Sequence, residues 1–461
     1  MYSWVFVMHN TDYENSQRLL SWHGFGIKFV SPLYLAILNM MMVLVAIFFP
    51  PSWFEAAAKE PDLVFLNAKY FVLTLICTCA FIAGIVIYRF LRGSHKIKFG
   101  ASPKFYPSLG LLKKSSNILR VCLVINILTM VIVFYGIGFQ NFSKSFTDKD
   151  IALAVRNQIL VVGRIGGVNI LALQTFVFVS LVIASFIYYS ARKDDNNRVV
   201  IRRFNVLFVF VVVTYLLVCV LTITRWPILQ MSFAFLLTYI LYRNSSVGLG
   251  VRRIFKMGSA FIIISLAVFL GIGTLKMGLS HVLGSVIGYT IASYNLGAAV
   301  VDGVFRVPTS GSTYATLGFF WQFPFLGYYF RQIGIANGLN LPVAGGANMT
   351  EVDAWARVIT ETTNLNPHWL WTTVYSYIYA DVGLAFVIVF LIYGAISQYL
   401  FENFNKLRLI HVLLYAFFFV YQIAWFTSVF ISSTLLVDYF AYTLIINMYI
   451  RADWRRAVVV A

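Results

Sequence analysis

Runs of about 20 apolar residues, the length at which a helix crosses the hydrocarbon core of a bilayer, recur along almost the whole chain. Ten such runs can be placed, at residues 30–49, 63–90, 121–139, 170–189, 204–222, 228–242, 257–275, 372–400, 410–426 and 429–449. Hydrophobic residues make up 60% of the chain and charged residues only 11%, which is typical of a membrane protein. The sequence therefore predicts an all-α polytopic integral membrane protein with about 10 spans, or up to about 12 if residues 2–8 and 282–301 also enter the membrane.

The charges between these runs predict a topology. Residues 89–120 contain only basic charges, whereas residues 52–62 are mostly acidic. Because cytoplasmic loops of membrane proteins are rich in lysine and arginine, the first of these segments is expected inside, and both termini follow it into the cytoplasm. The net charge of +18 is then explained by short loops that meet anionic lipid headgroups, and no nucleic-acid partner is expected.

The interval from 276 to 371 is the longest that does not consist of simple spans, and it is expected outside. It divides the chain into residues 1–275 with about seven spans, the large loop, and residues 372–461 with about three spans. The loop brings together basic, acidic and histidine side chains: Lys276, Arg306, Arg331, Arg357, Asp302, Glu351, Asp353, Glu361, His281 and His368. A turn-rich loop of mixed charge is where a membrane protein is expected to carry its chemistry, so an active site on the outer side of the membrane is predicted.

Arg225 is the most informative residue in the turns. It stands between the runs 204–222 and 228–242, so its guanidinium must lie close to the outer surface. A guanidinium matches phosphate oxygens with two parallel hydrogen bonds, but it also anchors turns at the interface, and both interpretations remain open. His368 is likewise either an acid/base group or an interfacial histidine, and Glu351 is either a reactive acid or the cap of a short helix.

Several classes of site have no support in the sequence. The four cysteines, Cys77, Cys79, Cys122 and Cys219, lie within apolar runs and are expected to pack there rather than to form disulfides or bind metal. No Walker loop, HExxH or CxxC motif is present, so neither a metal nor a cofactor is predicted. Asp381 and Asp438 are the clear acids within the spans, fewer than a proton- or sodium-coupled transporter usually has. Residues 1–28 lack the uniform apolar core of a signal peptide.

Four segments resemble bacterial O-antigen polymerases, which lengthen surface polysaccharide from oligosaccharide repeat units. The first, Thr224-Arg225-Trp226-Pro227, is similar to a short arginine-containing turn of that family, and the second, Ser293-Tyr294-Asn295-Leu296-Gly297, is similar to its Tyr-x-x-Gly segment. The third is the Gly- and aromatic-rich stretch of residues 318–330. The fourth is the Tyr-rich stretch of residues 373–379, followed by Asp381-Val382-Gly383-Leu384. Position 382 is valine where an aromatic residue is commoner in the family.

The resemblance implies an enzyme of the bacterial inner membrane that joins glycans linked to undecaprenyl pyrophosphate. Its partners would be these lipid-linked glycans, membrane lipids and a chain-length regulator protein. It implies that arginines hold the pyrophosphate, while tyrosines of the matching motifs contact substrate: Arg225, Arg331, Arg306, Arg164, Tyr294 and Tyr375. The base that accepts the sugar hydroxyl proton would be His368, Asp302 or Asp381.

Three alternatives stay open. An O-antigen ligase has the same layout and the same class of donor. A glycolipid flippase or other transporter would need a polar central cavity. A purely structural membrane protein would tolerate replacement of the loop arginines.

Overall fold

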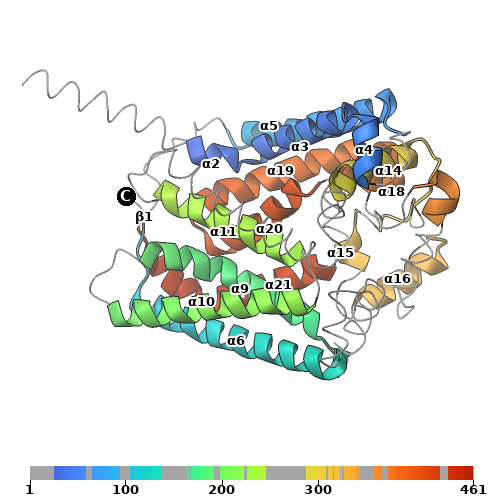
Figure 1. Ribbon diagram of the computed structural model, residues 1–461. Helices are drawn as coiled ribbons and strands as arrows, with labels where there is room; N and C mark the ends of the chain where they lie inside the picture. Colours follow the sequence, from blue (N-terminus) through green and yellow to red (C-terminus); the bar gives the residue numbers. More distant parts are fainter. Residues whose placement is uncertain are drawn as a thin grey trace, which may run out of the picture.

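The computed structural model describes residues 25–58, 65–93, 104–137, 164–165, 168–191, 198–222, 226–245, 287–307, 310–314, 316–321, 323, 326–339, 341, 358–365, 372–425 and 434–459. These residues form a bundle of long helices with a group of short helices at one end (Figure 1). The long helices are α3 (Pro32–Ile47), α5 (Ala68–Leu91), α6 (Leu109–Ile137), α9 (Ile170–Ala191), α10 (Arg198–Leu221), α11 (Trp226–Ser245), α19 (Phe386–Asn405), α20 (Leu409–Ile423) and α21 (Thr434–Ala457). The short ones include α2 (Phe25–Phe29), α4 (Pro51–Ala58), η1 (Gly288–Ala292), α14 (Ser293–Val301), α15 (Gly318–Trp321), α16 (Leu326–Ala336) and α18 (Val374–Val382).

Helices occupy nine of the ten runs predicted to span the membrane, and the run 257–275 lies outside the described residues. Five stretches are long and apolar enough to cross a bilayer: Ala68–Leu91, Leu109–Tyr135, Leu173–Ala191, Arg198–Leu221 and Val374–Asn405. The predicted all-α membrane class is therefore supported by helices of the right length and composition. The full number of spans stays a prediction.

Local sequence explains where several helices begin. Pro32 and Pro51 stand in the first turns of α3 and α4, where a missing N–H costs no hydrogen bond. Asn67 caps α5, because its side-chain oxygen accepts from the backbone N–H of Tyr70 at 2.9 Å. Helix α6 begins at Leu109, well before the predicted run 121–139, and its first turns carry Lys113 and Lys114. Lysine favours helix, but it is excluded from a search for apolar runs.

The interior of the bundle is formed largely by α9 and α20, while α3, α5, α6, α10 and α19 expose apolar side chains on their outer faces. The most extensive helix pair among the described elements is α5 with α19. The two helices cross at Gly84 and Gly394, where a Cβ on Gly84 would collide with the backbone carbonyl of Leu391 and one on Gly394 with that of Phe81. Glycine at both positions lets the backbones touch, as in many membrane helix pairs.

Two short antiparallel ladders complete the fold. Strand β1 (Lys104–Phe105) pairs with β4 (Val458–Val459), so the segment after α5 is joined to the end of α21. Strand β2 (Arg164–Ile165) pairs with β3 (Val168–Asn169) just before α9.

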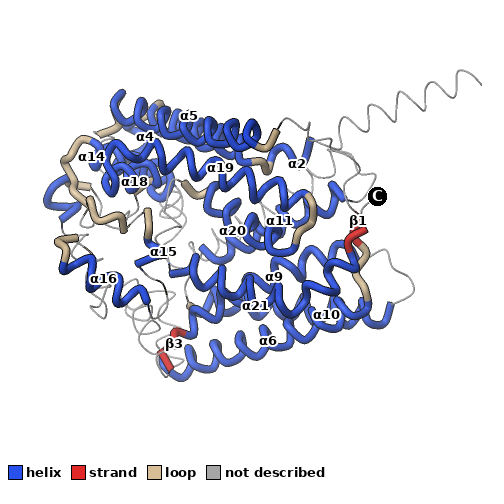
Figure 2. Tube along the Cα trace, turned by 180° about the vertical axis from the view of Figure 1, so that it is seen from behind, coloured by secondary structure: helices blue, strands red, loops and turns tan. Residues whose placement is uncertain are grey.

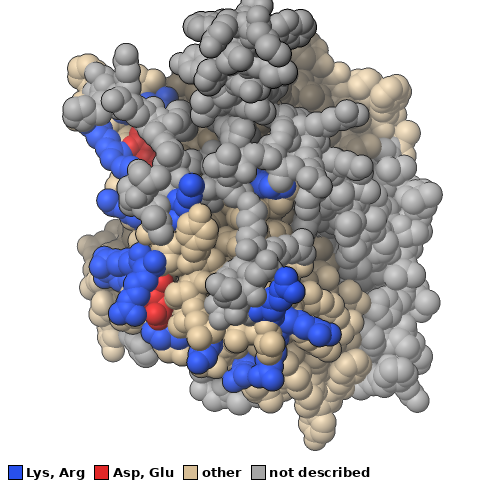
Figure 3. Space-filling view, turned by 90° about the vertical axis from the view of Figure 1, so that its left-hand side faces the viewer, with Lys and Arg blue, Asp and Glu red and all other residues tan. Residues whose placement is uncertain are grey.

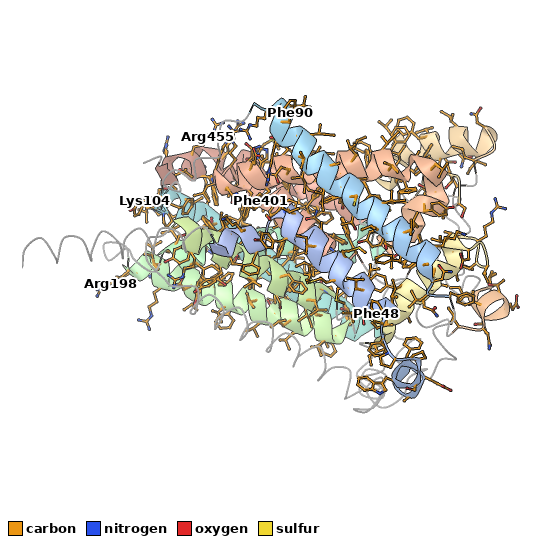
Figure 4. All side chains as sticks on the ribbon, turned by 90° about the horizontal axis from the view of Figure 1, so that it is seen from above. Phe48, Phe90, Lys104, Arg198, Phe401 and Arg455 are labelled. Carbon is orange, nitrogen blue, oxygen red and sulfur yellow. The ribbon has the colours of Figure 1, made fainter. Side chains whose placement is uncertain are left out.

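Described basic residues gather at the end of the bundle that holds β1 and α2, as the view onto that end shows (Figure 3). In the view from above, Arg198, Lys104 and Arg455 lie at this end and Phe48 lies at the other (Figure 4). At the end that holds β1 and α2, the acids Glu402 and Asp453 are paired with Arg92 and Lys114. We call the end of the bundle that holds β1 and α2 the basic end. The short helices α14, α15, α16 and α18 lie at the opposite end (Figures 1 and 2).

Candidate functional site

Helix α18 enters the bundle and folds back rather than crossing it. The rings of Tyr375 and Phe390 stack with centroids 5.8 Å apart, and those of Tyr379 and Phe386 lie 5.9 Å apart, so α18 runs antiparallel to α19. The reversal is at Gly383, whose φ of +56° is readily adopted only by glycine. The first part of the predicted span 372–400 is therefore a separate short helix, because hydropathy cannot distinguish a straight apolar helix from a hairpin. Helix α19 alone, with 20 residues, has the length of a span.

The first turn of α18 lies among core side chains. The backbone N–H of Val374 donates to the carbonyl of Trp425 at 3.0 Å, and the Trp425 ring also contacts the rings of Phe81 and Tyr375. Thr373, which precedes the helix, is fully buried. Irregular backbone inside a membrane bundle needs cover from neighbouring protein or lines a cavity, so the start of α18 is a candidate position for a site.

Helix α14 packs beside α18 and runs in the same direction. A Cβ on Gly297 would lie 2.9 Å from the Ser376 hydroxyl, 3.0 Å from that of Tyr70 and 3.1 Å from that of Thr373. One turn further along, Ala299 and Val300 share an apolar cluster with Tyr377 and Ala380. Gly297 thus makes room for side chains from α5 and α18 at one point.

These side chains form a hydroxyl cluster, which comprises Tyr70, Thr372, Thr373 and Ser376. The oxygens of Tyr70 and Thr373 are 2.8 Å apart, those of Thr373 and Ser376 3.0 Å, and those of Thr372 and Ser376 2.6 Å. All four residues are buried. Polar groups inside a membrane bundle are costly and either hold helices together or mark a functional site.

Two of the predicted substrate-binding residues, Tyr294 and Tyr375, lie close to this cluster. Both side chains are fully buried, and the Tyr294 hydroxyl is near enough to those of Tyr70 and Tyr375 to interact electrostatically. Among the described residues, the Tyr294 hydroxyl and the Asn295 side-chain nitrogen have no hydrogen-bond partner. The structure therefore brings the two tyrosines together, but as buried groups rather than as an open binding surface.

Asp302, a predicted base, directly follows α14 at the same end. Its carboxylate accepts from the Asn67 side-chain nitrogen at 2.6 Å and from Lys69 Nζ at 3.2 Å, and Lys69 also donates to the carbonyl of Val301 at 2.8 Å. The side chains of Asp302 and Lys69 are 24% and 59% exposed. Asn67 and Lys69 were not predicted as site residues, because both fall within the predicted run 63–90. The sequence feature that could have identified this position is a lone lysine inside an apolar run.

Asp381, the third predicted base, anchors a loop. It is buried near the C-terminal end of α18, and its Oδ2 accepts from both the backbone N–H of Thr316 at 2.9 Å and the Thr316 hydroxyl at 2.7 Å. The neighbouring Gly311 N–H donates to the carbonyl of Ala380 at 3.1 Å. These bonds attach Gly311 and Thr316 to α18.

The remaining predicted residues are not brought into this group by any described contact. Arg306 is exposed shortly after Asp302, and Arg331 is partly buried in α16. Arg164 lies in β2, where only the backbone is described. Arg225, His368 and Glu351 lie outside the described residues.

The anchoring role of Asp381 can be tested by comparing three substitutions. Asp381→Ala should lower the free energy of unfolding by about 3 kcal/mol, because it removes two bonds to a carboxylate and leaves a buried N–H unpaired. Thr316→Val should cost about half as much, since the N–H bond remains. Thermal unfolding of the purified protein measures both. Thr362→Val, at an exposed threonine that bonds its own helix, is the control and should change little.

The contrary result would be an Asp381→Ala variant as stable as the parent. Stability retained by Asp381→Asn together with complete loss of function would instead assign proton transfer to Asp381.

Comparison with known proteins adds no assignment: no protein-family model, no curated protein and no solved structure matches the chain.

Proposed function

We propose that this protein is a membrane glycosyltransferase that polymerises oligosaccharide repeat units linked to undecaprenyl pyrophosphate at the outer leaflet of a bacterial inner membrane. The observation that carries the proposal is the meeting of polymerase-like segments at one end of the bundle. Residues 293–297 in α14 lie against residues 373–376 of α18, and Asp381 holds the loop that leads into residues 318–330. Segments distant in sequence have to converge in this way if they share a site.

The distribution of charge supports the orientation that this function needs. The basic end, with Arg92, Arg198 and Arg455 among its residues, would face the cytoplasm under the positive-inside rule. The opposite end, with Asp302, Lys69 and the hydroxyl cluster, would then face the periplasm, where lipid-linked repeat units are joined.

The proposed reaction is a displacement at the anomeric carbon of the donor sugar. The acceptor hydroxyl attacks this carbon, the bond from the carbon to the pyrophosphate oxygen breaks, and its electron pair leaves with the lipid pyrophosphate. The hydroxyl proton passes to a base. Because the leaving group is already activated, the enzyme mainly positions the substrates and stabilises the charge of the pyrophosphate.

We assign charge stabilisation first to Arg225, with Arg331, Arg306 and Arg164 behind it, and add Lys69 as an exposed cation beside Asp302. The two bonds from Thr316 favour an anchoring role for Asp381. His368 and Asp302 are then the preferred bases, and Asp302, whose side chain is partly exposed, is the one within the described part of the chain.

Deletion of the gene, followed by complementation, tests the proposal. The polymerase function predicts single-repeat glycolipid with no ladder of longer chains on a gel of the surface polysaccharide, and the ladder should return with the complementing gene. A ligase would instead leave complete polymer unattached. A flippase would leave lipid-linked repeats facing the cytoplasm, and either result would replace the polymerase proposal.

A further inference from the structure

Helix α16 presents its apolar face outward. Leu326, Tyr329, Ile333 and Ala336 lie on one face at helical spacing, and the first three are 51%, 63% and 61% exposed. The helix is about 16 Å long by its 11 residues, so these side chains form a continuous strip along it. A helix on the surface of a water-soluble protein has the opposite arrangement, with its apolar face inward.

The inward face of α16 is already packed. A Cβ on Gly334 would lie 2.6 Å from a methyl carbon of Leu341 and 3.3 Å from the Trp321 ring. On the same side the rings of Phe320 and Phe330 stack with centroids 4.2 Å apart and planes 11° apart. The outward strip is therefore not a core face that has lost its contacts, because the helix has a separate, small-residue face for its neighbours.

We propose that the outward strip of α16, Leu326, Tyr329, Ile333 and Ala336, lies in the interfacial layer of the membrane and contacts lipid. A bilayer must surround the long apolar helices of this bundle, and α16 lies at one end of them (Figure 1). Interfacial helices are amphipathic and carry aromatic side chains at the level of the headgroups. Next to the strip, Phe319 and Phe323 are also exposed, which extends the aromatic surface.

Charge favours lipid over a protein partner with basic residues. Between residues 316 and 341 the sequence has one charged side chain, Arg331, and no acid. Arg331 is partly buried and lies on the side of α16 opposite the strip, so the strip itself carries no charge, which suits contact with lipid. This inference does not depend on the proposed enzyme activity.

Site-directed spin labelling tests the proposal on the full-length protein, purified without substrate and placed in nanodiscs that contain zwitterionic and anionic phospholipid. All four native cysteines are replaced by alanine, and one cysteine is introduced at a time by Tyr329→Cys, Ile333→Cys or Gln332→Cys. Gln332 is the matched control, because it is exposed on the same helix but outside the strip. The accessibility of each label to oxygen and to a water-soluble nickel chelate is measured.

Labels at 329 and 333 are expected to have an oxygen-to-nickel accessibility ratio several-fold higher than the label at 332, because oxygen concentrates in lipid. Ratios at 329 and 333 as low as that of a label in water would overturn the proposal and place the strip in water. Labels at 329 and 333 that neither reagent reaches would overturn it as well, because protein, such as a second copy of the chain, would then cover the strip. Thermal unfolding of each labelled variant confirms that the comparison is made on folded protein.

Discussion

Replacing Gly84 by leucine is expected to drive α5 away from α19 and to abolish the folded bundle. The obstacle is a backbone carbonyl, that of Leu391, which cannot rotate away as a side chain could. Overpacking of a core costs about 1–3 kcal/mol where side chains can adjust, so this substitution should reach or exceed the upper value. Because folded proteins are stable by only about 5–15 kcal/mol, Gly84→Leu should give little monodisperse protein in detergent. Gly84→Ala should give folded protein with a lower Tm.

Val86→Leu is the matched control, because it enlarges a side chain of the same helix that faces outward. Its Tm should equal that of the parent. Gly394→Ala should act like Gly84→Ala, and the two together should not be additive, since both separate the same two helices. A parental Tm for Gly84→Leu would show that α5 and α19 do not cross at this point.

Arg225→Lys is expected to abolish long polymer while leaving the protein level and the single-repeat glycolipid unchanged. Lysine keeps the charge but loses the planar fork that grips two phosphate oxygens. Removing one preorganised donor from a reacting centre typically lowers the rate about 100-fold or more, which is enough to remove the ladder of chains from a gel. Arg225→Ala should have the same effect.

Arg243→Lys provides the comparison, because Arg243 lies towards the other end of the helix that follows Arg225. There it contacts Tyr239 at the basic end, and its replacement should leave the polymer ladder intact. Normal chain length in the Arg225→Lys strain would rule out bidentate recognition of pyrophosphate by this residue.

Most of the long helices could be predicted from hydropathy, because each carries apolar side chains along most of its length, whether these face the core or the surface of the bundle. The ends were less predictable. Helix α6 continues through Lys113 and Lys114, where helix propensity outweighs polarity. The hairpin at Gly383 was missed for a different reason: residues on both sides of it are apolar, so only the positive φ of one glycine records the reversal.

The candidate site was predictable as a region and not as a set of contacts. Tyr294 and Tyr375 belong to segments far apart in the sequence, and they lie near the same hydroxyl cluster. That Lys69 pairs with Asp302, or that Thr316 donates twice to Asp381, depends on how helices pack, and no spacing along the chain encodes it. Lys69 in particular could not be recognised from the sequence as a site residue, because the residues around it are apolar.

The α18–α19 hairpin bears on how the chain is inserted during synthesis. The 32 residues Val374–Asn405 form one apolar stretch, which the insertion machinery would first meet as a single segment. Gly297 and Tyr70, which receive α18, have been synthesised by then, whereas Trp425, which accepts from Val374, comes later. The bond from Val374 to Trp425 can therefore form only after α20 has been made, so the contacts at this end of the bundle are completed late in biogenesis.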